Sequence, residues 1–255
     1  MSEMHSRFFS DHLQLPVIGK KGLDKLKCTR VLVVGAGGLG CPVVSALAAS
    51  GIGYIGILDG DKVELKNLAR QYLYTPAQVG TLKTAAAITQ LKIRYQDTVF
   101  IAYPFFANET NIHSIFSEYD IVIDATDNFP ARLLIGHTGI QLGTPVIYGS
   151  IFRSEVQITI FNYKAQRLAI DDVFTLQPAA EGMPCEVSGT YVIGSMIAGM
   201  LMANEAIKVV LDLPDKLTGK LLLFDVLSLQ KRVINFSSLQ SDPTETTPEM
   251  KTCEI

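Results

Sequence analysis

Paired cysteines are missing from this sequence. Its four cysteines, Cys28, Cys41, Cys185 and Cys253, stand apart and form no Cys-x-x-Cys motif. This spacing lacks the usual ligand pattern of a structural zinc site and does not suggest a disulfide framework. Unpaired cysteines are typical of a reducing compartment, so we predict a cytoplasmic protein without zinc.

Net charge and long apolar runs are also scarce. The 255 residues carry a formal net charge of -3, so no overall basic surface is available to nucleic acid. Residues 1–11 contain no apolar core of a secretory signal. The most apolar stretch, 191–211, is interrupted by Asn204, Glu205 and Lys208, and we predict a buried helix there. Neither nucleic acid nor a membrane is expected as a main partner.

Strands and helices alternate along most of the chain. Apolar and β-branched runs predict strands at 31–34, 54–58, 99–103, 121–124, 145–148, 155–161 and 220–225, and helical patterns fall at 43–50, 82–93, 112–117 and 191–211. This alternation predicts an α/β, Rossmann-like fold with a mainly parallel sheet, helices on both faces and an antiparallel C-terminal extension. We expect one domain over residues 1–236 and a disordered tail over 237–255, which is rich in Ser, Thr, Pro and Glu.

A glycine loop follows the first strand directly. It contains Gly35, Gly37, Gly38 and Gly40, and Asp59 ends the next strand. Such a loop brings backbone and a helix N-terminus close to a phosphate, and the acid can accept hydrogen bonds from ribose hydroxyls. These residues predict a nucleotide site without specifying the nucleotide. Taken alone, they favour an NAD-dependent oxidoreductase.

Polar residues beyond the loop favour a different chemistry. They are Asp61, Asn67, Arg70, Gln71, Lys83 and, after a later strand, Asp127. In adenylation a carboxylate attacks the α-phosphate of ATP while pyrophosphate leaves, so cations and a metal must neutralise the phosphates. Arg70 and Lys83 can supply the cations, and Asp127 can bind Mg²⁺. Hydride transfer has no need of this set.

The same residues resemble the ThiF/MoeB/HesA family, bacterial relatives of ubiquitin-activating enzymes. The resemblance covers roughly residues 13–233 and is carried by Leu-Pro-x-Ile-Gly at 15–19, the glycine loop, Asp59-x-Asp61, Asn67-Leu-x-Arg70-Gln71, Val79-Gly80-x-x-Lys83, Thr126-Asp127-Asn128 and Glu205-Ala-Ile-Lys208. It implies that Gly37 and Gly38 line ATP and that Asp59 holds the ribose. It also implies that Asn67, Arg70 and Lys83 contact the phosphates, and that Asp127 binds Mg²⁺.

The sequence departs from the family in two places. Many members have two Cys-x-x-Cys pairs that bind zinc, and neither pair exists here. Members also begin with a segment whose second arginine reaches across a dimer to the ATP phosphates. Alignment on Leu15 and Pro16 puts Asp11 at that position, so the contact is lost or comes from Arg7.

Cys185 lies before the long helix, where members with a thioester or sulfur-transfer step keep a cysteine. Proximity to a helix start would favour its thiolate, although an unreactive loop cysteine fits equally well.

The leading hypothesis is adenylation of the C-terminal Gly-Gly carboxylate of a small ubiquitin-like (β-grasp) sulfur carrier, for thiamine, molybdopterin or another product, by a homodimer. The alternatives are a catalytically weakened nucleotide-binding or dimerisation module of the same family, and an NAD-dependent oxidoreductase.

Overall fold

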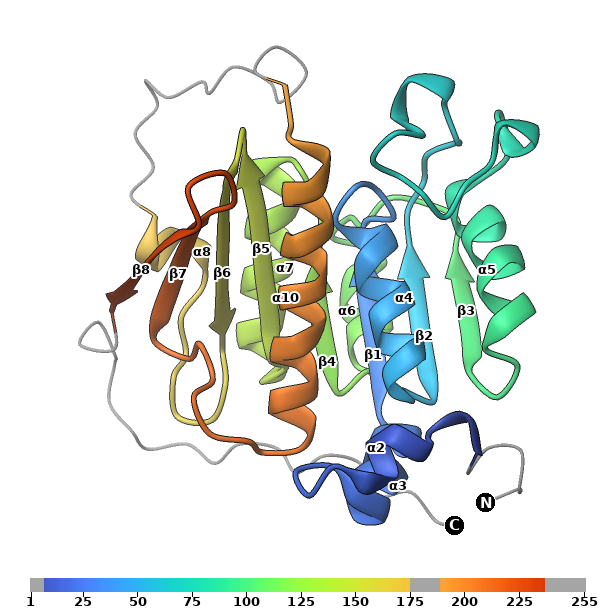
Figure 1. Cartoon of the computed structure of the whole chain (residues 1–255). Coiled ribbons are helices and arrows are strands. Elements are labelled where there is room, and N and C mark those ends of the chain that lie inside the picture. The colour runs from blue at the N-terminus through green and yellow to red at the C-terminus, as the bar shows by residue number, and fades with distance from the viewer. Residues whose placement is uncertain (1–6, 175–188, 237–255) are drawn as a thin grey trace.

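The fold is built on one eight-stranded sheet (Figure 1). The computed structural model describes residues 7–174 and 189–236. The strand order is β3-β2-β1-β4-β5-β6-β7-β8. The first five strands of this order are parallel, and the last three continue the sheet in antiparallel fashion. The α/β class, the parallel core and the antiparallel extension are therefore confirmed.

The parallel half forms from short, almost wholly apolar strands. These are β1 (Arg30–Val34), β2 (Tyr54–Leu58), β3 (Val99–Tyr103), β4 (Ile121–Asp124) and β5 (Val146–Phe152). In β1, β2 and β4 nearly every residue is buried, because helices cover both faces of the sheet.

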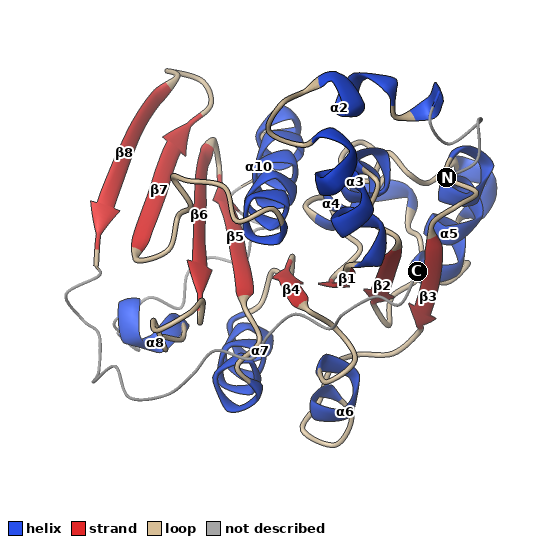
Figure 2. Ribbon diagram, turned by 90° about the horizontal axis from the view of Figure 1, so that it is seen from below, coloured by secondary structure: helices blue, strands red, loops and turns tan. Residues whose placement is uncertain are grey.

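Two layers of helices enclose this sheet, as Figure 2 shows from below. One face is covered by α3 (Gly19–Cys28), α4 (Gly40–Ser50), α5 (Lys83–Arg94) and α10 (Val192–Val210), with the short α2 (Ser10–Gln14) beside α3. The other face is covered by α6 (Ile112–Phe116), α7 (Phe129–Leu142) and α8 (Ile170–Val173). Each face has its own cluster of buried apolar side chains.

The antiparallel half consists of β6 (Glu155–Phe161), β7 (Lys220–Asp225) and β8 (Gln230–Asn235). Strand β6 is almost entirely buried, whereas every residue of the edge strand β8 is exposed. Burial therefore decreases steadily from the centre of the sheet to this edge.

Helix α10 is long and apolar enough to cross a membrane by length and composition, yet half of it is buried within the protein. It packs on α4, β5 and β6. Gly199 permits the close contact with α4, since a Cβ there would lie 2.4 Å from Pro42 Cγ and 2.6 Å from the Leu39 carbonyl oxygen. The prediction of a buried core helix at 191–211 is confirmed.

Helix α7 and strand β8 were not expected from the sequence, and neither were the short helices α2 and α8. Helix α7 fills the gap between β4 and β5, and β8 follows β7 in a hairpin. Strand β5 also extends to Phe152, beyond the predicted end at residue 148. Cys28, the last residue of α3, is disulfide-bonded, so the expectation of unpaired cysteines is wrong at that position.

Candidate active site

The candidate site lies where the order of the parallel strands reverses. Strands β1 and β4 are neighbours, and the chain leaves them toward opposite edges of the sheet. The loops that follow these two strands touch each other. A Cβ on Gly35, which has φ +97°, would lie 2.6 Å from the Ala125 carbonyl oxygen. In open α/β sheets, this crevice at the carboxyl ends of the strands is where ligands bind.

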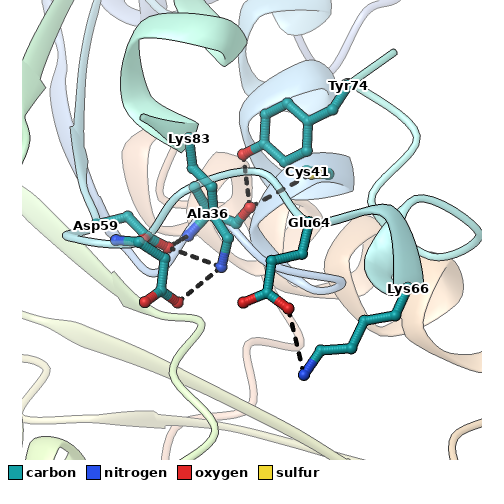
Figure 3. A network of polar contacts seen from close by, with 8 residues as sticks. Ala36, Cys41, Asp59, Glu64, Lys66, Tyr74 and Lys83 are labelled. Carbon is teal, nitrogen blue, oxygen red and sulfur yellow. Dashed lines mark hydrogen bonds and ion pairs between the residues drawn. The ribbon is translucent and has the colours of Figure 1, made fainter. Parts of the chain in front are cut away.

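The glycine loop is held by the peptide groups of Ala36 (Figure 3). The Ala36 N–H donates to Asp59 Oδ2 at 2.7 Å, and the Ala36 carbonyl accepts from the Tyr74 hydroxyl at 2.7 Å and from the Cys41 thiol at 3.6 Å. Gly40 then starts α4 so close to Gly35 that a Cβ would lie 2.0 Å from the Gly35 carbonyl oxygen. The loop is therefore supported from both sides.

Lys83 is buried between two carboxylates (Figure 3). Its Nζ lies 2.8 Å from Asp61 Oδ2 and 3.9 Å from Asp59 Oδ2. Asp59 also accepts from the Asp61 N–H at 2.7 Å. The sequence predicts that Lys83 contacts phosphate and that Asp59 holds ribose. In the structure both side chains already have protein partners, and the Asp61 side chain is about half exposed.

The segment with Asn67, Arg70 and Gln71 lies over the glycine loop. Asn67 ends the short 3-10 helix η1 (Leu65–Asn67), and its carbonyl accepts from the N–H groups of Arg70 and Gln71. The Arg70 side chain lies 3.3 Å from where a Gly38 Cβ would be, and Gln71 Nε2 lies 3.7 Å from the corresponding point at Gly37. Among the residues that the structure describes, the buried Gln71 Oε1 has no hydrogen-bond partner. The structure therefore brings these two side chains and the glycines together.

The loop after β4 carries Asp127. Asp124 is fully buried and accepts from the Thr126 N–H at 3.0 Å and the Thr126 hydroxyl at 2.6 Å. Asn128 caps α7 by accepting from the Ala131 N–H at 3.0 Å. Asp127, between them, is exposed. Asp124 thus acts as a strand-end cap and leaves Asp127 as the available carboxylate of this loop.

Burial controls the protonation of the groups around the loop. It raises the pKa of Asp59, an effect that the Lys83 charge opposes. It likewise raises the pKa of Asp124, which the Arg132 charge opposes. Burial also raises the pKa of the Cys41 thiol to about 12 and that of Tyr74 above its usual value, so both remain protonated donors to Ala36 at neutral pH.

The remaining predicted residues lie elsewhere. Cys185 falls outside the described residues. Asp11 is on α2, at the end of the sheet opposite the glycine loop (Figure 1). Beside it, Phe9 packs 3.4 Å from where a Cβ of Gly51, at the far end of α4, would be. Asp11 is therefore remote from the glycine loop of its own chain.

Metal binding can be judged from the donors that the described part of the chain offers. There, no group of three or more His, Cys, Asp or Glu side chains forms a metal cluster. Mg²⁺ usually takes one or two carboxylates together with phosphate oxygens, so the exposed Asp127 suits a magnesium ion that arrives with a nucleotide.

Sequence reasoning missed Ala36, Tyr74, Ser195 and Arg132. Ser195 of α10 is buried, and its hydroxyl oxygen lies 3.6 Å from where a Gly38 Cβ would be. Arg132 donates to the Thr126 carbonyl. All four act through backbone groups or close packing, which leave no signal in residue spacing.

Comparison with known proteins assigns this geometry to a class. The ThiF family profile matches residues 9–246. A sulfur carrier protein adenylyltransferase of Thermus thermophilus is 37% identical over 223 residues, which are 86% of this chain and 82% of that protein. An adenylyltransferase and sulfurtransferase, MOCS3-1 of Zea mays, is 37% identical over 92% of this chain. The chain spans only 50% of that longer relative.

Solved structures share the fold. The crystal structure of PaaA has a TM-score of 0.77 at 21% identity and covers 92% of this chain and 75% of its own. The crystal structure of Escherichia coli MccB with ATP has a TM-score of 0.72 at 18% identity and covers 97% of this chain and 82% of its own.

The chain belongs to the ThiF family. Within that family it is an adenylyltransferase of the ubiquitin-activating-enzyme-like class. The resemblance stated from the sequence is confirmed, and the alternative of an NAD-dependent oxidoreductase is wrong.

Proposed function

We propose that the protein uses ATP and Mg²⁺ to adenylate the C-terminal Gly-Gly carboxylate of a small ubiquitin-like sulfur-carrier protein. The observation that carries this proposal is the meeting of three groups at one crevice. Three parts of the chain meet at Ala36 and its neighbours. They are the glycine loop, the segment with Arg70 and Gln71, and the Asp59–Lys83 pair.

In the proposed reaction, a carboxylate oxygen of the carrier attacks the α-phosphorus of ATP. The bond between the α-phosphorus and the bridging oxygen breaks, pyrophosphate leaves, and the carrier's C-terminus becomes a mixed anhydride with AMP. Negative charge grows on the leaving pyrophosphate, and fixed cations stabilise it because they need no reorganisation. We assign this role to Arg70 and Lys83, with Asn67 and Gln71 as neutral donors.

The glycine loop would bind the nucleotide through Gly35, Gly37, Gly38 and Gly40, while Asp59, whose carboxylate already orients the loop, would accept from the ribose. Asp127 would bind Mg²⁺, which neutralises phosphate charge when present. Asp61 would take part by releasing Lys83 to the phosphates. In this scheme every residue acts from the carboxyl edge of the parallel strands.

The choice of a sulfur carrier is supported by the relatives. The Thermus thermophilus protein is named for acting on a sulfur carrier protein, and the MOCS3 proteins combine adenylyltransferase with sulfurtransferase activity in about twice the length. We propose thiocarboxylate formation for thiamine, molybdopterin or another sulfur-containing product as the fate of the adenylate. We also propose one adenylation domain over residues 1–236, a zinc-free homodimer and a cytoplasmic location.

A weakened member of the family is the second candidate, and the observation that favours it is Asp11. In other family members, an arginine at the position of Asp11 reaches the ATP phosphates of the partner subunit. An aspartate at this position would oppose phosphate binding, because both groups are negatively charged. Nucleotide binding without turnover is the result that would favour this candidate. If the reaction of this protein includes a second, covalent transfer step, as in some members of the family, we propose Cys185 as the residue that carries it.

ATP–pyrophosphate exchange tests the leading proposal. Purified protein is mixed with candidate carriers that end in Gly-Gly, and labelled pyrophosphate incorporation into ATP is measured. We expect exchange that depends on the carrier, and a loss of roughly 100-fold or more in Asp127→Asn, because one charge-stabilising group is removed.

The matched control is Asp24→Asn. Asp24 is a carboxylate on α3 that pairs with Lys20 at 2.6 Å, away from the glycine loop. It should leave the exchange rate unchanged. Exchange that needs no carrier, or that survives Asp127→Asn intact, would refute the proposal.

A further inference from the structure

Arg132 joins the Asp127 loop to the rest of the fold. It lies in the first turn of α7. Its Nη2 donates to the Thr126 carbonyl at 2.8 Å, and its Nη1 donates to the Tyr148 hydroxyl oxygen at 2.9 Å. The guanidinium carbon also lies 4.9 Å from the centre of the Tyr148 ring. One side chain thus connects the loop after β4, helix α7 and strand β5.

The residues on both sides of Asp127 are held in place. Thr126 donates twice to the buried Asp124, and Asn128 caps α7. The Asn128 carbonyl also accepts from the Arg132 N–H at 3.3 Å. Within residues 7–174 and 189–236, by contrast, the Asp127 carboxylate has no hydrogen-bond or ion-pair partner of its own. The backbone on both sides of Asp127 is therefore held, on one side through the Thr126 carbonyl that Arg132 binds.

We propose that Arg132 is a positioning residue for magnesium binding: by holding the Thr126 carbonyl, it directs the Asp127 carboxylate toward the metal that accompanies ATP. This inference rests on the proposed function. Arg132 does not contact the nucleotide in this scheme. It acts only through the peptide that precedes Asp127.

Arginine is suited to this task because its planar group presents several donors in fixed directions. Two of them satisfy acceptors on different elements at once, which an ammonium group on a flexible stem does poorly. Residues that orient metal ligands typically change metal affinity by roughly 10–100-fold when they are replaced. Arg132→Lys keeps the positive charge near Asp124 and removes the fixed geometry.

The experiment measures ATP binding by calorimetry at increasing Mg²⁺ concentrations, without a carrier and without turnover. The readout is the Mg²⁺ concentration that gives half of the full increase in ATP affinity. We expect Arg132→Lys to raise it by roughly 10-fold or more. Tyr148→Phe, a milder change that keeps the Thr126 bond, should raise it by less.

Arg30→Lys is the matched control. Arg30 starts β1, at the opposite end of the sheet, and makes the same kind of contacts. Its Nε donates to the Glu118 carbonyl at 2.6 Å, and its guanidinium carbon lies 5.2 Å from the centre of the Tyr54 ring. This variant should lose stability and leave the Mg²⁺ dependence unchanged.

Each result has a distinct meaning. Unchanged Mg²⁺ dependence in both Arg132→Lys and Tyr148→Phe would overturn the positioning role while leaving the proposed function intact. An equal shift in Arg30→Lys would also overturn it, because general destabilisation would then explain the effect. A wild-type protein that binds no ATP would refute the proposed function and this inference together. A shift confined to the Arg132 and Tyr148 variants supports it.

Discussion

The two halves of the sheet differ in how they use polar residues. In the parallel half, Asp59, Lys83 and Asp124 are buried near the carboxyl ends of β2 and β4, and Asp127 beside them is exposed. In the antiparallel half, Lys164 and Lys216 approach the Asp212 carboxylate at 3.1 and 2.9 Å. Lys216 is largely buried, whereas the Asp212 and Lys164 side chains are 57% and 56% exposed.

This difference indicates where precise geometry matters. A buried polar group has no water to replace a lost partner, so a small shift removes a whole interaction. A solvent-exposed ion pair contributes little and tolerates change. We therefore expect matched substitutions in the two halves to have unequal effects. Two pairs of substitutions and one pH-dependent variant test this.

The largest difference is expected between two glycines. Gly40→Ala would place a Cβ 2.0 Å from the Gly35 carbonyl oxygen, which forces the glycine loop open. We expect a loss of roughly 3 kcal/mol, near the upper end for one substitution, and loss of ATP binding. Gly219→Ala, before β7, puts an alanine at φ +69°, a strain of about 1 kcal/mol, and should keep ATP binding. Urea unfolding and calorimetric titration measure both. Equal losses of ATP binding in Gly40→Ala and Gly219→Ala would contradict the expected difference between the two halves.

A smaller difference is expected between two tyrosines. Tyr74→Phe leaves the buried Ala36 carbonyl without its closest donor and should cost about 1–3 kcal/mol, with weaker ATP binding. Tyr163→Phe removes a hydroxyl that donates to the exposed Asp212 at 3.1 Å, and should cost less than about 0.5 kcal/mol. The midpoints of urea unfolding compare them. A neutral Tyr74→Phe would show that the Cys41 thiol alone can support the loop.

The smallest effect concerns pH. Hydrogen bonds from Lys216, Lys164 and Tyr163 hold the pKa of Asp212 well below its usual value of 3.8. Since the folded pKa is lowered, this carboxylate stabilises the fold above pH 3.8 and loses that contribution as the pH falls further. Asp212→Asn should therefore reduce stability slightly at pH 7 and flatten its decline between pH 4 and pH 3. Unfolding midpoints across this range test the sign, and a steeper acid decline in the variant would contradict it.

Much of the fold could be predicted from the sequence. The bounds of β2, β3, β6 and β7 agree with the predicted ones, because each is a compact apolar or alternating run between turn residues. Helix α7 was missed because its apolar residues surround the whole helix and two glycines interrupt it. Strand β8 was missed because it begins with Gln230, Lys231 and Arg232 and is exposed on both faces, which removes the alternation that marks a strand.

The site was predictable in its position and not in its internal contacts. Strand ends indicated Asp59 and Asp127, and the family pattern indicated Arg70 and Lys83. That Tyr74 and Asp59 would meet at Ala36 depends on how two distant segments pack, and neither spacing nor periodicity contains that information. The same holds for Arg132, whose acceptor is a backbone carbonyl.

The contacts of Lys83 have a consequence for how a nucleotide enters. This cation is already neutralised by Asp61 at 2.8 Å, with Asp59 nearby. In the proposed reaction, nucleotide binding would then be an exchange of counterions: a phosphate that takes Lys83 would displace Asp61 and leave its carboxylate to attract a cation from solution. The affinity for ATP should therefore depend less on ionic strength than a site with free lysines would, and more on which divalent ion is supplied.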